Sequence, residues 1–95
     1  MEKIGLIAGN GIFPVLFARE ARARGYRVVA VAHVGESRPE IDQAADSVDW
    51  IRVGQIAKLI GVFQRAGVRR AVMAGGIDKV RSLSGVRPDW RAVRL

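Results

Sequence analysis

Short apolar runs alternate with segments of helical periodicity along most of this chain, and this alternation constrains its fold more than any other feature. Four runs are long enough for a strand and too short for a helix: 3–8, 27–32, 48–53 and 69–74. A strand–helix–strand repeat joins parallel strands by right-handed crossovers. The sequence therefore predicts an α/β fold, a Rossmann-like three-layer sandwich with a mainly parallel sheet of about four strands.

Two segments between these runs have the spacing of amphipathic helices. The first begins near Phe13, carries Pro14 in its first turn and ends at Gly25. The second is opened by Gly54 and closed by Gly67. Its apolar residues follow the i, i+3, i+4, i+7 pattern and are predicted to form its buried face: Ile56, Leu59, Ile60 and Phe63.

The remaining segments are less regular. Residues 33–47 are polar and predict a loop with one helical turn around 40–45. Past residue 77 the periodicity fades, and a helix is expected from about Asp89. We therefore divide the chain into a Rossmann-like domain at 1–77 and a segment at 78–95. That segment is interpreted as a linker and the start of the connection to a missing C-terminal catalytic domain.

The charge of the chain is concentrated in its second half. The formal net charge is +7, and the halves contribute −1 for residues 1–50 and +8 for residues 51–95. An excess of this kind suits a nucleic acid, an anionic membrane surface or a phosphorylated substrate, and it is equally typical of solvated surface. The absence of cysteine excludes disulfides and thiolate metal sites. No apolar run is long enough to predict a membrane span.

Two glycine-marked turns follow strands and are expected at the same edge of the sheet. The first is Gly9-Asn10-Gly11, placed between a strand and a helix, where backbone N–H groups can meet a phosphate. The second is Gly75-Gly76, with Lys79 shortly after it. Ligands of parallel sheets bind beyond the carboxyl ends of the strands, so these six residues are the predicted substrate-binding set. The alternative is that the glycines only make sharp turns.

The first turn departs from the dinucleotide-binding fingerprint. Pro14 stands where the third glycine would be, and the second strand ends in Ala32-His33 rather than in an acid. Glu36 is the nearest carboxylate and lies in the following loop. NAD is therefore the poorer interpretation of this turn.

The chain lacks the residues of a complete catalytic site. His33 is its one histidine, which excludes a His-based triad or a multi-histidine zinc site, and it is interpreted as a strand-end residue. Asp42, Asp46 and Asp49 are predicted to be surface or capping residues. No catalytic residue and no metal ligand is assigned.

With these features in place, the sequence resembles the N-terminal domain of the LpxI-type UDP-2,3-diacylglucosamine pyrophosphatases. The resemblance is carried, in order, by "GLIAGNGIFPVLFAREARARGY", "VGQIAKLIGVFQRAGVRRAVMAGGI" and "RPDWRAVRL". The step "AGGIDKV" departs from relatives, which tend to have a basic residue and a proline there. That departure affects the roles assigned to Gly76 and Lys79.

The resemblance implies a hydrolase of lipid A biosynthesis that splits the pyrophosphate of a UDP-linked acylated glucosamine into UMP and 2,3-diacylglucosamine 1-phosphate. It also implies a divalent metal (magnesium or manganese) held outside this chain, and a homo-oligomer in the full-length form. The implied location is cytoplasmic and peripheral on the inner-membrane surface. The chain would then be the substrate-binding half, inactive alone. The alternatives are a non-enzymatic nucleotide-binding Rossmann-like module and, less favoured, a basic nucleic-acid-binding domain.

Overall fold

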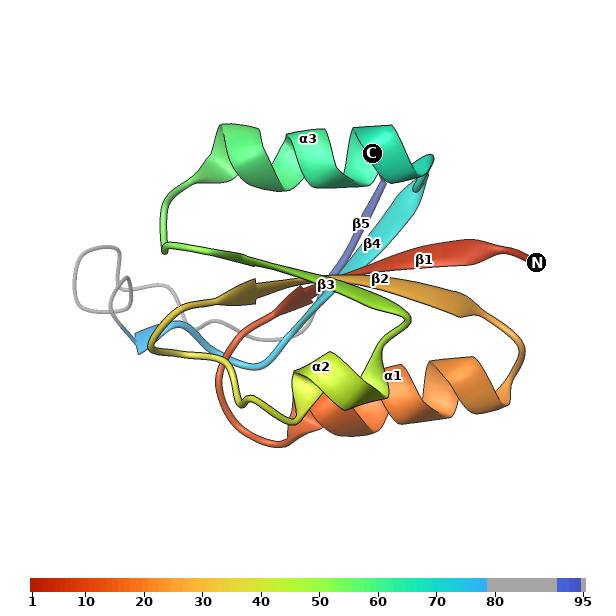
Figure 1. Ribbon diagram of the computed structural model, residues 1–95, viewed down its shortest axis with the longest axis horizontal. Helices are drawn as coiled ribbons and strands as arrows, with labels where there is room; N and C mark the ends of the chain where they lie inside the picture. The colour runs from red at the N-terminus through yellow and green to blue at the C-terminus, as the bar shows by residue number, and fades with distance from the viewer. Residues whose placement is uncertain (79–90, 95) are drawn as a thin grey trace.

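A computed structural model describes residues 1–78 and 91–94 of the chain, and its described part is a three-layer α/β sandwich (Figure 1). The strands are β1 Lys3–Ala8, β2 Arg27–His33, β3 Ser47–Ile51, β4 Arg70–Ala74 and β5 Arg91–Arg94. The helices are α1 Phe13–Ala23, α2 Ile41–Ala44 and α3 Ile56–Ala66. Helix α3 covers one face of the sheet, and α1 and α2 cover the other. The predicted Rossmann-like sandwich is confirmed.

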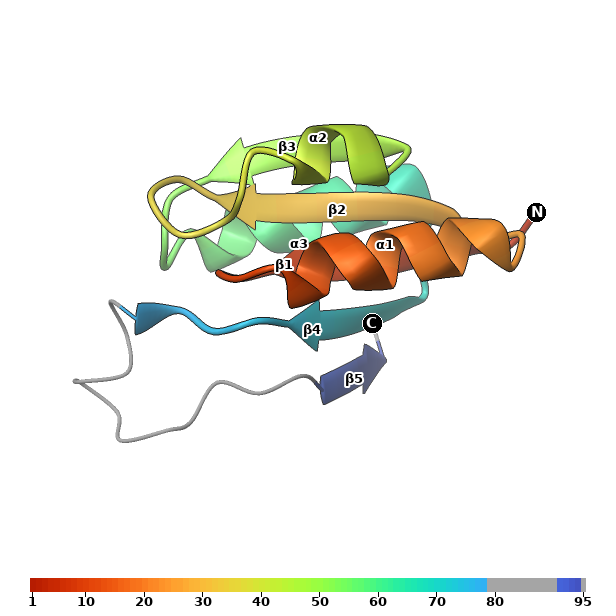
Figure 2. The ribbon, with the colours of Figure 1, turned by 90° about the horizontal axis from the view of Figure 1, so that it is seen from below.

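The sheet has the strand order β3-β2-β1-β4-β5. Strands β1 to β4 are parallel, whereas β5 pairs with β4 in the antiparallel direction. Figure 2 shows β2, β3 and β4 pointing one way and β5 the other. The helix expected from about Asp89 is wrong over residues 91–94, which extend the sheet instead. The domain boundary at residue 77 stays a prediction.

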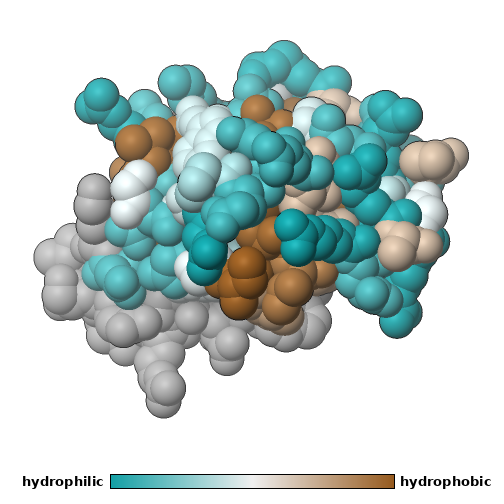
Figure 3. Space-filling model, turned by 60° about the horizontal axis from the view of Figure 1, so that its bottom comes forward, coloured by the Kyte–Doolittle hydropathy of each residue, from teal (hydrophilic) through white to brown (hydrophobic). Residues whose placement is uncertain are grey.

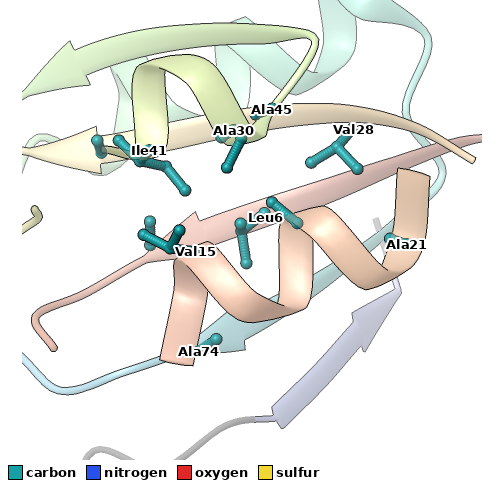
Figure 4. Packing of buried hydrophobic residues seen from close by; sticks show 12 residues of the cluster. Leu6, Val15, Ala21, Val28, Ala30, Ile41, Ala45 and Ala74 are labelled. Carbon is teal, nitrogen blue, oxygen red and sulfur yellow. The ribbon is translucent and has the colours of Figure 1, made fainter. Parts of the chain in front are cut away.

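Small residues bring α1 and α2 close to the sheet. The cluster on this face combines a few larger side chains with many alanines (Figure 4). Its buried members are Leu6, Ala8, Val15, Ala18, Ala21, Val28, Ala30, Ala32, Ile41, Ala44, Ala45 and Ala74. Small alanine side chains let the helices pack close to the strands, and the short turn at residues 9–12 places the start of α1 beyond the end of β1.

The face under α3 differs from the predicted one. Leu59, Val62 and Phe63 are buried against the sheet. Ile56 and Ile60, predicted to share that face, remain 58% and 40% exposed. The apolar arc of α3 is wider than the arc that the sheet covers. The helix ends as expected at Gly67, whose φ of 74° is in the left-handed region that favours glycine.

Candidate ligand site at the carboxyl edge of the sheet

The direction of the strand order reverses between β1 and β4, and both glycine turns lie at this switch point. The chain runs outward from β1 through β2 to β3 and then returns to the other side of β1 with β4. The turn at residues 9–12 follows β1, and residues 75–78 follow β4. In open α/β sheets, ligands bind in the crevice outside this point. The structure thus brings together the two turns that were predicted to share an edge.

The two turns pack against each other through their backbones. The Gly9 N–H donates to the Ala74 carbonyl at 2.8 Å, and the Asn10 N–H donates to the Gly76 carbonyl at 2.7 Å. A Cβ on Gly9 would lie 2.3 Å from the Gly76 oxygen. A Cβ on Gly75, whose φ is 84°, would lie 2.4 Å from the Asn10 oxygen. Close backbone packing therefore already requires glycine at positions 9 and 75.

Pro14 has a place in the same packing. It is fully buried in the first turn of α1, and its Cγ lies 3.0 Å from the position of a Cβ on Gly75. In a dinucleotide-binding turn, a third glycine allows close packing of helix and strand. Here the proline ring packs on a glycine of the neighbouring turn instead.

The Asn10 side chain connects the first turn to two other loops. Its Oδ1 accepts a hydrogen bond from the Gly76 N–H at 3.1 Å, and its Nδ2 lies 3.5 Å from Oε1 of Glu36. The same Glu36 oxygen accepts from the Asp78 N–H at 2.9 Å. Sequence reasoning placed Glu36 only in a loop after the second strand. Its position as the first acid after β2 was the one available signal that it reaches this site.

His33 and Ser37 fix the backbone beside the first turn. His33 is 3% exposed, and its Nδ1 lies 2.7 Å from the carbonyl oxygen of Ala8, the last residue of β1. Because a carbonyl only accepts, Nδ1 carries the proton. The Ser37 hydroxyl accepts from the His33 N–H and donates to the same Ala8 oxygen, both at 2.8 Å. These contacts give His33 a structural role at the strand end.

The start of α1 is the open part of the site. Gly11 has a φ of 79°, is exposed, and a Cβ on it would meet no atom within 4 Å. The helix has no side-chain cap at Ile12 and no acid in its first turn. The positive end of its dipole therefore lies beside the exposed backbone of residues 11–13, an arrangement that can bind anions, although Pro14 contributes no N–H.

Exposed apolar side chains lie next to this helix end. Ile12, Phe13 and Leu16 are each between 43% and 49% exposed. Figure 3 shows hydrophobic residues gathered on this face of the molecule. The open end of α1 is therefore polar at its backbone and apolar on its outer surface.

A model of the LpxI N-terminal domain matches residues 3–95. The chain belongs to the LpxI N-terminal domain family. This family connects it with lipid A biosynthesis. No match was found among curated proteins.

For this LpxI N-terminal domain, the described residues can be searched for a metal site and for a membrane-spanning helix. Within residues 1–78 and 91–94, no group of three or more ligand-type side chains is arranged to hold a metal ion. The described residues thus do not fit a divalent metal centre. In the same part of the chain, no helix is long and apolar enough to cross a bilayer. Lys79 of the predicted site lies outside the described residues.

The described basic residues of this LpxI N-terminal domain do not gather at the glycine turns. Several lie where the parallel strands begin, at the opposite edge: Lys3, Arg27, Arg69 and Arg70. Near the glycine turns, the described charges that contact the site belong to Glu36 and Asp78. Within the described residues, the charge excess of the second half therefore does not point to the glycine turns as a phosphate site.

Proposed function

We propose that the chain is the substrate-binding N-terminal domain of a UDP-2,3-diacylglucosamine pyrophosphatase. The reaction is hydrolysis of the pyrophosphate bond to UMP and 2,3-diacylglucosamine 1-phosphate in lipid A biosynthesis. Membership of the LpxI N-terminal domain family supports the proposal. The observation that carries it is the uncapped start of α1, open to solvent at the switch point of the sheet.

In this proposal the chain binds and orients the substrate. Phosphate oxygens accept hydrogen bonds from the backbone N–H groups around Gly11, which can approach because no side chain stands over that residue. Gly9, Asn10, Gly75 and Gly76 form the rigid floor of the site. The exposed Phe13 and Leu16 offer apolar surface beside it, which suits a substrate whose sugar carries acyl chains.

The proposal assigns the chemical step to residues beyond this chain. His33 is committed to the Ala8 carbonyl through Nδ1, and Oε1 of Glu36 accepts a hydrogen bond from the Asp78 N–H. A magnesium or manganese ion is proposed for the second domain of the full-length enzyme, since the described residues offer it no ligand set. The same proposal places the enzyme in the cytoplasm, peripheral on the inner membrane and homo-oligomeric.

The test is to measure hydrolysis and binding with the same preparation. The isolated chain is incubated with the UDP-diacylglucosamine and magnesium or manganese, and UMP release is followed. In parallel, UDP is titrated into the isotopically labelled chain while amide shifts are recorded. We expect no hydrolysis and saturable shifts at residues 9–13 and 75–76. Robust turnover, or UDP shifts confined to other residues, would contradict the proposal.

A nucleotide-binding module without enzymatic role is the second candidate. The switch-point position of the β1–α1 turn favours it, since this is where Rossmann-like folds bind dinucleotides. Titration with NAD and ADP in the same experiment separates the two. Saturable shifts with these adenine nucleotides and none with UDP would favour the module.

A further inference from the structure

Glu36 is a described side chain of the site whose chemistry the proposed function has not used. It is half-buried in the loop after β2, and one of its two carboxylate oxygens holds the neighbouring loop. Oε1 accepts the Asp78 N–H and faces the Asn10 amide, whereas Oε2 has no hydrogen bond to any described residue. The carboxylate is thus fixed through one oxygen, with the other available to a ligand.

The position of Glu36 in the fold gives that free oxygen a specific use. In nucleotide-binding sheets of this topology, an acid that follows the second strand accepts hydrogen bonds from ribose hydroxyls, while the β1–α1 turn binds the phosphates. Glu36 follows β2, and its Oε1 lies 3.5 Å from Asn10 Nδ2, within the β1–α1 turn. The tertiary structure therefore brings the two halves of a nucleotide site to adjacent positions.

We propose that Glu36 recognises the ribose of a nucleoside diphosphate through its free carboxylate oxygen. A ribose hydroxyl donates to Oε2, and the diphosphate lies toward Gly11 and the start of α1. The proposal rests on the proposed function, which it deepens by placing the nucleoside half of the substrate on this chain. A carboxylate at this point also disfavours a second phosphate on the ribose, because the two negative charges would repel.

Binding of UDP, 2′-deoxy-UDP and 3′-deoxy-UDP to the unmodified chain tests this assignment without any substitution. A hydrogen bond to a charged group contributes enough to discriminate by roughly tenfold or more. We expect at least one deoxy compound to bind about tenfold more weakly than UDP. Equal affinities for all three compounds would overturn the role of Glu36.

The Glu36→Gln variant identifies the group responsible. Its readout is the ratio of deoxy-UDP to UDP dissociation constants, because this ratio cancels the general effect of removing a negative charge near the phosphates. We expect the ratio to fall from about ten toward one. Glu40→Gln is the matched control: it removes a charge from the same loop, at a residue paired with Arg38, and should keep the ratio. A ratio unchanged in Glu36→Gln would overturn the proposal.

The experimental results that would contradict this inference differ from those that would contradict the proposed function. If UDP binds at residues 9–13 without discrimination of the ribose, the proposed function stands and the role of Glu36 falls. If UDP does not bind there but glucosamine 1-phosphate does, the chain holds the sugar half, and the ribose assignment is again wrong. If neither binds, both proposals are wrong.

Discussion

The two edges of the parallel sheet differ in what their residues do. At the carboxyl edge, three loops are joined by short backbone contacts, glycines and the Asn10–Glu36 pair. At the amino edge, cationic side chains stand around an open pocket of about 270 Å³ lined in part by Lys3, Arg69 and Arg70. Lys3 and Arg27 are direct neighbours in the register of β1 and β2. The glycine-rich carboxyl edge has the site geometry, and the basic amino edge does not.

A helix end and a carboxylate account for two of the cations at the amino edge. Right-handed crossovers place the carboxyl ends of α1 and α3 there, and these ends carry partial negative charge. The Lys3 ammonium donates at 2.7 Å to the carbonyl of Ala66, the last residue of α3. Arg70 pairs with Glu2 at the same edge. A basic residue can donate a hydrogen bond to the carboxyl end of a helix, as Lys3 does. A surplus of basic residues therefore does not by itself locate a phosphate site.

The largest expected difference between the edges is in the stability lost when a glycine is replaced by alanine. Gly75→Ala forces a left-handed φ on alanine and places its Cβ 2.4 Å from the Asn10 oxygen, so both strain and overpacking oppose folding. We expect a loss of about 3 kcal/mol in the free energy of unfolding. Gly67→Ala at the amino edge is the matched control, because Gly67 has a similar φ but open space around it. It should lose only about 1 kcal/mol. Urea denaturation measures both, and equal losses would contradict the packing argument.

A smaller difference is expected for hydrogen bonds at the two edges. Ser37→Ala removes the hydroxyl that accepts from the buried His33 N–H and donates to Ala8. The Ala8 carbonyl keeps its bond from His33 Nδ1, but leaving the buried His33 N–H without its acceptor should lower the free energy of unfolding by about 1–2 kcal/mol. Lys3→Met, at the exposed bond to Ala66, should cost less than about 1 kcal/mol, since water replaces the lost donor. Thermal or urea unfolding tests the order, and a costlier Lys3→Met would reverse the comparison.

Two substitutions, each changing the net charge by −1, compare how much the two edges contribute to the affinity for UDP. Ile12→Glu puts a carboxylate beside the open start of α1 and should weaken UDP binding about fivefold, because a nearby like charge costs about 1 kcal/mol in water. Arg69→Gln at the amino edge should change the affinity less than about twofold. A strand of six residues spans about 17 Å, which exceeds the Debye length at physiological salt. Calorimetric titration measures both, and a marked loss in Arg69→Gln would restore the role of the basic edge.

The smallest expected effect is a pH response near the carboxyl edge. The hydrogen bond from Arg38 lowers the pKa of the exposed Glu40 carboxyl below its ordinary value. Because the folded pKa is the lower one, the stabilising contribution is complete above the unfolded pKa and is lost as the pH falls through the folded pKa. Arg38→Ala should raise the Glu40 pKa toward that of an unpaired glutamate, as measured by carbon NMR of the carboxyl group. An unchanged pKa would show that the pair does not persist in solution.

Much of the fold could be predicted from local pattern. The runs at 27–32 and 69–74 became β2 and β4 within one residue at each end, because short apolar runs bounded by glycines leave few alternatives. Periodicity was a poorer guide to which side chains of a helix are buried. It grouped Ile56 and Ile60 with Leu59, but the sheet covers only part of that apolar arc. Residues 91–94 read as helical because a short segment carries too little periodicity, and pairing with β4 decided their structure.

The glycine turns themselves were determined by sequence, since a strand, two close glycines and a helix follow one another in the chain. The tertiary structure decided what lies beside them. Glu36 reaches Asn10 across 26 positions of sequence, and Lys3 caps α3 across 63. Local backbone geometry sets where strands, helices and turns form, and it acts over a few residues. Strand order and crossover handedness set which turns and charges share an edge, and only the folded sheet fixes them.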